Sequence, residues 1–133
     1  MATLRKQIDV AASPAAAWSA VREFGALHTR LVPGFVTDCV LEQDGTVRLV
    51  TFGNGLQVRE RLVTRDDAGR RLAYTTEGGR ATHYNAVVEV QEGPAGGSRL
   101  LWTVDLLPDA LAPAVDSMMD AGAKAMTAAL RPA

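Results

Sequence analysis

Apolar residues recur at steps of three and four between positions 111 and 130, which places them on one face of a helix. This face comprises Leu111, Val115, Met118, Met119, Gly122, Met126 and Leu130. Pro113 falls in the first turn, where a helix tolerates the missing backbone N–H. The pattern predicts one long C-terminal helix that needs a broad apolar cover. Its three methionines suit an ordinary core and also the wall of a ligand cavity, because flexible thioether side chains fill irregular gaps.

Upstream of this helix, apolar residues alternate with polar ones, which is the period of a β-strand. The predicted strands cover 4–10, 35–42, 46–52, 56–66, 70–77, 82–91 and 98–107. Each connection between the last six strands contains glycine, which is typical of turns between antiparallel strands. After the first strand, Ser13-Pro14 predicts the start of a short helix that ends near Gly25, and a second helical turn is expected at 26–32.

Seven strands, two short helices after the first strand and one long helix at the end predict an α+β fold. In this fold an antiparallel sheet curls around the C-terminal helix. The 133 residues contain no repeat or linker, so a single domain is expected over positions 1–133. Hydrophobic residues make up 47% and charged residues 22% of the chain, which is ordinary for a globular domain with its own core.

Charge and residue usage exclude several classes of function. A net charge of -1 without a basic block argues against a nucleic-acid partner. No apolar run reaches the length of a transmembrane helix or a signal peptide, so we expect no membrane insertion and a cytoplasmic location. Cys39 is the single cysteine, and His28 and His83 are the two histidines. We therefore predict no internal disulfide, no metal site and no cofactor.

A carboxylate falls in the inward register of one predicted strand. Leu56, Val58 and Leu62 share one face of the strand at 56–66, and Glu60 alternates onto the same face. Burial disfavours the charged form of a carboxyl group, and a neutral carboxyl can act as a general acid. Glu60 is therefore a candidate catalytic residue. The alternative is that Glu60 reaches water near the strand end or pairs with an arginine.

Aromatic residues with polar tips alternate inward on the last three strands. Tyr74, Tyr84 and Trp102 direct two hydroxyl groups and an indole N–H to the interior, as in a cavity with a few hydrogen-bond donors. The alternative is that they only complete the core. Tyr84 is the candidate catalytic partner of Glu60, and Tyr74 is the second choice. The predicted ligand contacts on the strands and the long helix are Val58, Glu60, Tyr74, Tyr84, Trp102, Met118 and Met119.

Short motifs along the chain resemble one known superfamily. The motifs are Ser13-Pro14-Ala15-Ala16-Ala17-Trp18, Arg59-Glu60-Arg61-Leu62 with Asp66-Asp67, Tyr74, Tyr84 and Trp102. In this order of elements the chain resembles the START/Bet v 1-like (SRPBCC) superfamily, and most closely its bacterial polyketide cyclase/dehydrase group. The resemblance covers nearly the whole chain. It implies the helix-grip fold with a hydrophobic cavity.

Two glycine-rich loops resemble those over the cavity of plant abscisic acid receptors, which belong to the same superfamily. Residues 53–57 take the place of the receptors' gate loop, and residues 78–84 the place of their latch loop. Neither loop has the receptors' own sequence, and Thr37 stands where they use a lysine to hold the ligand carboxylate. A hormone receptor is therefore not implied, although a lid over the cavity is. The predicted ligand contacts near the lid are Thr37, Gly53, Gly55, Leu56 and His83.

Two functions remain open. The first is a binding module that holds an apolar small molecule, aromatic or polyketide-like, under the lid. The second is a cofactor-free cyclase or dehydrase, in which Glu60 moves protons with Tyr84 or Tyr74. The superfamily uses one cavity for both purposes, so the fold does not choose between them. A third interpretation is a protein partner or a homodimer, whose mark would be an exposed apolar patch.

Overall fold

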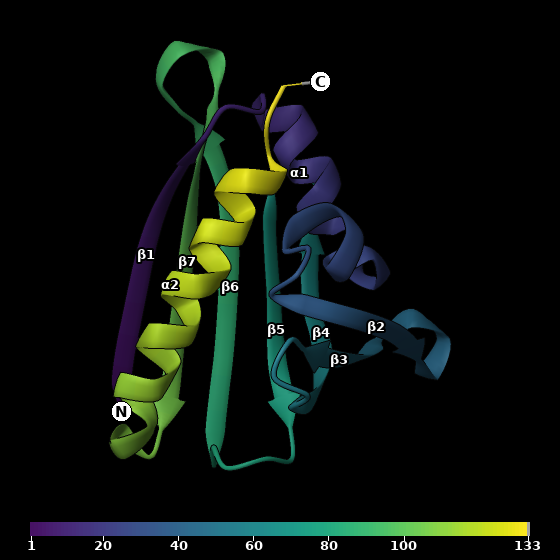
Figure 1. The fold of residues 1–133 in the computed structure, drawn as a ribbon, viewed down its shortest axis with the longest axis vertical. Helices are drawn as coiled ribbons and strands as arrows, with labels where there is room; N and C mark the ends of the chain where they lie inside the picture. The colour runs from purple at the N-terminus through teal and green to yellow at the C-terminus, as the bar shows by residue number, and fades with distance from the viewer. Residues whose placement is uncertain (133) are drawn as a thin grey trace.

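The computed structural model describes residues 1–132 and places seven antiparallel strands in one curled sheet (Figure 1). The strands are β1 (Ala2–Val10), β2 (Val36–Glu42), β3 (Val47–Phe52), β4 (Gln57–Asp66), β5 (Arg71–Glu77), β6 (His83–Glu92) and β7 (Ser98–Leu107). Their order across the sheet is β1-β7-β6-β5-β4-β3-β2, so the first strand pairs with the last. The predicted α+β fold is confirmed, with every strand in its expected place.

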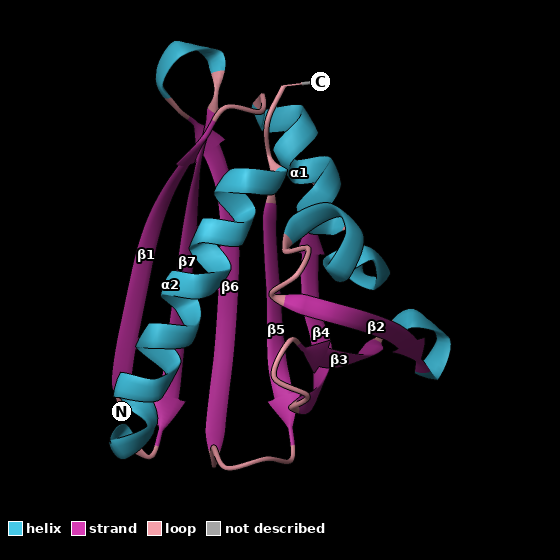
Figure 2. Ribbon diagram, in the orientation of Figure 1, coloured by secondary structure: helices cyan, strands magenta, loops and turns pink. Residues whose placement is uncertain are grey.

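Two α-helices and two short helical turns pack on one side of the sheet (Figure 2). They are α1 (Pro14–Arg22), a 3₁₀ turn (Phe24–Ala26), a π-helical turn (Leu27–Leu31) and α2 (Ala112–Ala129). α1 begins at its predicted cap, where the Ser13 hydroxyl accepts a hydrogen bond from the Ala16 N–H at 3.2 Å. The two turns replace the single helical turn expected at 26–32. Among residues 1–132, the structure contains no helix with the length and apolar character that a membrane crossing needs.

The long helix α2 crosses the sheet and turns its predicted apolar face toward it. Met119 and Met126 are buried on this face. Gly122 lies between them, and a Cβ at this position would come within 3.0 Å of the Trp102 ring. The missing side chain therefore lets the helix backbone approach β7 closely.

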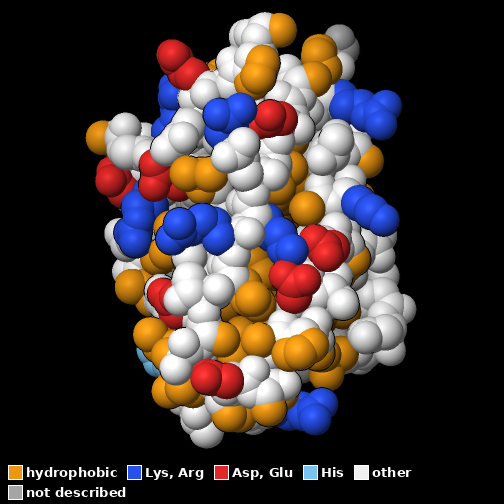
Figure 3. Space-filling view, turned by 90° about the vertical axis from the view of Figure 1, so that its left-hand side faces the viewer, with side chains coloured by type: hydrophobic (Ala, Val, Ile, Leu, Met, Phe, Trp, Pro, Cys, Tyr) orange, Lys and Arg blue, Asp and Glu red, His pale blue; other side chains and the backbone are white. Residues whose placement is uncertain are grey.

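Ion pairs fasten the solvent side of α2 to the sheet. The Lys6 ammonium of β1 contacts Asp116 at 2.7 Å and Asp120 at 2.9 Å. Figure 3 shows this side of the molecule, with charged side chains of both signs next to one another across its middle. Because these side chains are partly exposed, the pairs contribute mainly to the orientation of the helix.

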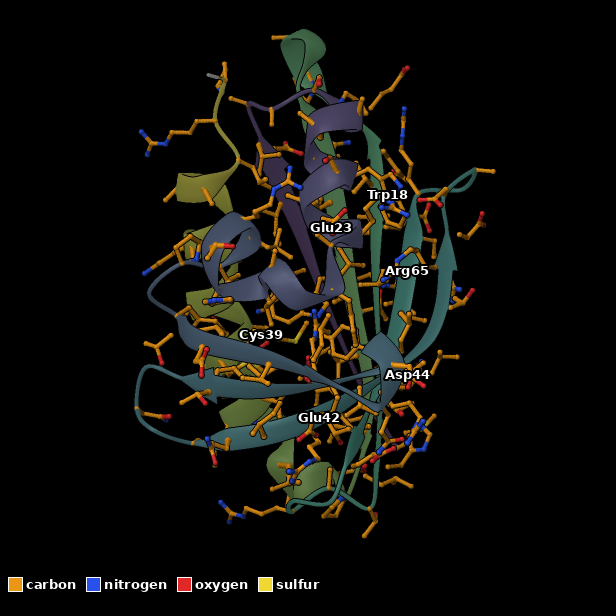
Figure 4. All side chains as sticks on the ribbon, turned by 90° about the vertical axis from the view of Figure 1, so that its right-hand side faces the viewer. Trp18, Glu23, Cys39, Glu42, Asp44 and Arg65 are labelled. Atoms are coloured by element: carbon orange, nitrogen blue, oxygen red, sulfur yellow. The ribbon has the colours of Figure 1, made fainter. Side chains whose placement is uncertain are left out.

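α1 is fastened to the turn between β4 and β5. The Trp18 indole N–H (Trp18 is labelled in Figure 4) donates a hydrogen bond to the Asp67 carboxylate at 2.9 Å, and Arg22 Nε donates to the same group at 2.8 Å. Arg65 Nε of β4 in turn donates to the Arg22 carbonyl at 3.0 Å. The first helix is therefore anchored outside the space between α2 and the sheet.

A bulge changes the register of β2. Its pairing with β3 shifts after Val36, so Val36 and Cys39 face inward while Thr37 is exposed. The Thr37 hydroxyl donates a hydrogen bond to the Thr51 carbonyl at 3.3 Å. Strand alternation predicts that Thr37, Cys39 and Leu41 share one face. That prediction is wrong for Thr37, because the bulge inverts the alternation before Asp38, whereas Cys39 and Leu41 stay in one register and Cys39 is buried as expected.

Candidate ligand-binding site

A cavity of about 610 Å³ lies between α2 and the curled sheet. Much of its wall is apolar and comprises Phe35, Phe52, Val58, Leu111, Val115 and Met118. Residues of the loop after β3 and of the loop after β5 border the opening, among them Gly53, Leu56 and Gly79. Figure 3 shows hydrophobic side chains gathering at this lower end of the molecule. The two glycine-rich loops thus lie at the mouth of the cavity.

A smaller chamber of about 40 Å³ continues the cavity into the core. The residues that line both spaces are Phe35, Phe52, Glu60, Tyr84 and Met118. The rings of Phe35 and Phe52 meet edge to face, with centroids 5.4 Å apart. The inner chamber also contains Arg48, Tyr74 and Trp102 in its wall. The inner end of the site therefore combines an ion pair with aromatic hydroxyl and indole groups.

Glu60 forms a buried ion pair with Arg48. The two residues are direct partners in the pairing of β4 with β3, so their side chains leave the sheet on the same face. Arg48 Nε donates to Glu60 Oε1 at 2.8 Å, and the two residues are 3% and 7% exposed. Arg48 Nη1 donates to the Phe24 carbonyl at 3.3 Å, and the guanidinium lies 4.1 Å from the Phe24 ring centroid. The carboxylate therefore has a fixed orientation and a compensating charge.

Two tyrosines and one tryptophan add neutral polar groups to the site. Burial raises the pKa of the Tyr74 and Tyr84 hydroxyl groups well above the ordinary value, and for Tyr74 the nearby Glu60 charge adds to this effect. Both hydroxyl groups therefore stay protonated and able to donate. Trp102 Nε1 is buried and has no hydrogen-bond partner among residues 1–132. The Tyr74 hydroxyl is its polar neighbour, but the two groups do not meet in the geometry of a hydrogen bond, so the inner chamber contains an indole donor that can still bind a ligand.

Comparison with known proteins identifies the family. The model of the family described as polyketide cyclase / dehydrase and lipid transport matches residues 1–132. The chain belongs to this family. No curated protein matches the sequence.

Solved structures with the same fold cover nearly all of this family member. The protein XoxI from Bacillus cereus has a TM-score of 0.88 at 22% identity, over 98% of this chain and 96% of its own. A protein from Thermobifida fusca has a TM-score of 0.76 at 30% identity, over 96% and 89%. A START superfamily protein from Mycobacterium smegmatis has a TM-score of 0.73 at 16% identity, over 96% of both chains. Together with the family match, the START neighbour confirms the predicted START/Bet v 1-like superfamily.

Eight of the predicted ligand contacts of this family member line the outer cavity or the inner chamber. They are Gly53, Leu56, Val58, Glu60, Tyr74, Tyr84, Trp102 and Met118. The structure therefore brings together the two candidate catalytic residues, because Glu60 and Tyr84 line the same wall. It also shows the alternative expected for Glu60, a pair with an arginine. The buried carboxylate is therefore compensated by the neighbouring guanidinium.

Four predicted contacts lie outside the cavity wall. Thr37 is exposed because of the β2 bulge, and His83 is exposed at the start of β6, where alternation turns it away from Tyr84. Met119 is fully buried in the core beneath α2. Gly55 forms the turn with φ +89 but does not reach the cavity. Within residues 1–132, no group of three His, Cys, Asp or Glu side chains could hold a metal ion.

Arg48 is the site residue that we did not predict from the sequence. Its register was nevertheless visible, because Arg48 alternates with Val50 and Phe52, which also face the interior. An arginine in the inward register opposite an inward glutamate predicts a buried ion pair. Phe35 and Phe52 are likewise absent from the predicted contacts; Phe35 lies in the turn before β2, and Phe52 ends β3.

Proposed function

We propose that the protein holds an apolar small molecule, aromatic or polyketide-like, in the cavity between α2 and the sheet. The observation that carries the proposal is a volume of about 610 Å³ with a mainly apolar wall. Pockets for drug-sized ligands range over roughly 300–1,000 Å³, so the space suits a molecule of several fused or linked rings. The family description, which includes lipid transport, supports the same class of ligand.

The chemistry of the wall favours a planar apolar body. Phe35 and Phe52 offer aromatic surfaces at the passage between the two spaces, and Met118 can adapt to different ring shapes. Each 100 Å² of apolar ligand surface removed from water contributes roughly 2.5 kcal/mol before the cost of association. A ligand of this kind therefore gains most of its affinity from burial.

The loops at 53–56 and 78–81 act as the lid in this proposal. Leu56 is 59% exposed beside the opening, and closure over a bound molecule would bury this side chain. Gly55, Gly78 and Gly79 have φ values of +89°, +74° and +80°, which L residues with side chains rarely adopt. Substitution of these glycines would therefore reshape the entrance to the cavity.

A cofactor-free cyclase or dehydrase is the second candidate function. The observation that favours it is a carboxylate that shares the wall of one cavity with tyrosine hydroxyl groups. Glu60 Oε1 is engaged by Arg48, while Oε2 accepts no hydrogen bond from residues 1–132. In this proposal Glu60 Oε2 accepts a proton from the substrate, and the Tyr84 hydroxyl donates to a developing oxyanion.

The first experiment distinguishes the two functions. The purified protein is incubated with a panel of linear and aromatic polyketide-like compounds, and the retained and released fractions are analysed by mass spectrometry. Retention with unchanged mass supports the binding module. A released product that has lost water or has been isomerised establishes an enzyme. Failure to retain or convert any compound would contradict both functions.

A matched pair of variants on one strand tests the location of the site. Val58→Trp places an indole in the cavity from β4, and we expect at least about tenfold weaker retention because the new ring occupies the ligand's volume. Val63→Trp adds the same group at an exposed position of β4 and should leave retention unchanged. Equal effects of the two variants would contradict the proposed location.

A further inference from the structure

The inner chamber presents a donor and an acceptor that lack partners. Trp102 Nε1 is buried without a hydrogen bond from residues 1–132, and an indole N–H can only donate. Glu60 Oε2 is the free oxygen of a carboxylate that can only accept. Trp102 is 4% exposed and its indole nitrogen is sealed from solvent, whereas Glu60 is 7% exposed and lines both the chamber and the outer cavity. A ligand group that accepts one hydrogen bond and donates another would satisfy both residues.

The net charge of the chamber limits the occupant further. Arg48 and Glu60 are the charged residues in its wall, and they neutralise each other at 2.8 Å. A ligand carboxylate would therefore meet the Glu60 charge without a free cation nearby. An ammonium group would satisfy Glu60 but would offer no acceptor to Trp102. A neutral group fits both requirements.

We propose, on the basis of the function proposed above, that the ligand enters the inner chamber with a neutral hydroxyl group, an alcohol or a phenol. The hydroxyl donates to Glu60 Oε2 and accepts from the Trp102 N–H, while its apolar body fills the outer cavity. The chamber volume of about 40 Å³ holds roughly three water-sized groups, enough for a hydroxyl and the adjoining carbon. A carboxylate does not fit this chamber, because Arg80, the unpaired cation among the described residues of the site, lies in the wall of the outer cavity.

The Tyr74 side chain fits the same chemistry. Tyr74 is 6% exposed beside Arg48, whose guanidinium lies 4.9 Å from its ring centroid. Burial raises the pKa of Tyr74, and the Glu60 charge adds to the rise, so the hydroxyl stays neutral. A neutral phenol both donates and accepts, and it can extend the hydrogen bonds of the ligand hydroxyl without adding charge.

Four naphthalene probes test the inference by isothermal titration calorimetry. 2-Naphthol carries the hydroxyl, 2-methoxynaphthalene only accepts, 2-methylnaphthalene lacks both functions, and 2-naphthoate carries the carboxylate. A hydrogen bond to a charged group is stronger than a neutral one, so we expect 2-naphthol to bind at least about tenfold more tightly than each of the others. Equal affinities, or tightest binding of 2-naphthoate, would overturn the inference.

The two tryptophans provide matched variants. Trp102→Phe removes the inner N–H and keeps an aromatic ring, so we expect the preference for 2-naphthol over 2-methylnaphthalene to fall about tenfold. Trp18→Phe removes an N–H that bonds to Asp67 outside the cavity, and the preference should persist. Thermal unfolding of both variants establishes that they are folded. Loss of the preference in both variants, or in neither, would contradict the role of Trp102.

The same titrations separate this inference from the proposed function. Probes that bind without preference leave the binding module intact and refute the hydroxyl-specific chamber. If no probe binds and the wider compound panel is also neither retained nor converted, the proposed function fails and the inference fails with it. A preference for 2-naphthol that depends on Trp102 supports both.

Discussion

At the scale of single residues, the Arg48–Glu60 pair is the costliest polar feature of the core. Both side chains lie on the inward face of the sheet, where apolar residues would pack without any loss of hydration. Their hydrogen bond, the Phe24 carbonyl and two aromatic faces offset part of that cost. A buried ion pair in the wall of a cavity is more easily explained by recognition of a ligand than by a gain in stability.

The pair makes a clear prediction for stability. Arg48→Met leaves the Glu60 carboxylate buried without a counter-charge, and we expect it to lower the free energy of unfolding by about 3–5 kcal/mol. The double variant Arg48→Met/Glu60→Leu removes both charges and should recover most of that loss. Urea unfolding followed by circular dichroism measures the three free energies.

An exposed ion pair between β4 and β2 is the control. Arg59 and Glu42 also meet at 2.8 Å, but both side chains reach solvent. Arg59→Met should therefore cost less than about 1 kcal/mol. If the double variant at positions 48 and 60 were no more stable than Arg48→Met, the loss would come from packing rather than from an unpaired charge.

Strand alternation accounts for the site residues that could be predicted. Glu60, Tyr74, Tyr84 and Trp102 lie on regular stretches of β4 to β7, so counting by two places them correctly. Thr37 could not be placed in this way, because a bulge has no reliable mark in the sequence. The inward register of Arg48 was readable from alternation, but the unsatisfied indole N–H of Trp102 depends on packing between elements, which a strand pattern does not reveal.

At the scale of elements, the contact of α2 with β7 depends on Gly122. Alanine favours a helix over glycine by about 1 kcal/mol, but its Cβ would lie 3.0 Å from the Trp102 ring. We expect overpacking to prevail, so Gly122→Ala should lower the free energy of unfolding by up to about 2 kcal/mol. Chemical denaturation tests the sign of the change.

The reverse substitution on the exposed face of α2 supplies the comparison. Ala121→Gly changes only helix propensity and should cost about 1 kcal/mol. A stabilised Gly122→Ala protein would show that α2 can move away from Trp102 without loss. The inner chamber would then be less rigid than the close contact indicates.

The anchor between α1 and the β4–β5 turn predicts a dependence on pH. Hydrogen bonds from Arg22 and Trp18 hold the pKa of Asp67 below its ordinary value of 3.8. The carboxylate therefore contributes stability above that value, and the contribution is lost as the pH falls through the lowered pKa. Asp67→Asn should show a smaller loss of thermal stability on acidification than the wild type, measured by thermal unfolding followed by circular dichroism.

An exposed carboxylate without an ion pair provides the reference. Glu92 makes no ion pair within residues 1–132, so Glu92→Gln should retain the acid dependence of the wild type. The same acid dependence in Asp67→Asn and the wild type would mean that the Asp67 contacts do not hold α1 in solution.

The elements themselves follow closely from local chemistry. The Ser13 cap, the proline after it and the glycine turns mark element ends within one or two residues of the observed bounds. The region after α1 is less regular, because its 3₁₀ and π-helical turns follow the packing of Leu27 and Leu31 rather than a helical repeat. Strand patterns alone do not show that the first strand, β1, pairs with the last strand, β7, at one edge of the sheet.

At the scale of the whole molecule, the cavity is a place where stability has not been maximised. A volume of about 610 Å³ between the long helix and the sheet forgoes contacts that larger side chains would make. Natural proteins commonly sacrifice stability at functional sites. The space is therefore evidence for a ligand, and filling the space should separate stability from binding.

Val115→Phe makes this separation. The larger side chain projects from α2 into the outer cavity, where it buries apolar surface without a neighbour to displace. We expect the free energy of unfolding to rise by roughly 1 kcal/mol, while retention of the polyketide-like panel falls at least about tenfold. Ser117→Phe adds the same ring on the exposed face of α2 and should change neither property. Unchanged retention in a stabilised Val115→Phe protein would place the ligand elsewhere, because one volume cannot hold both the new ring and the bound molecule.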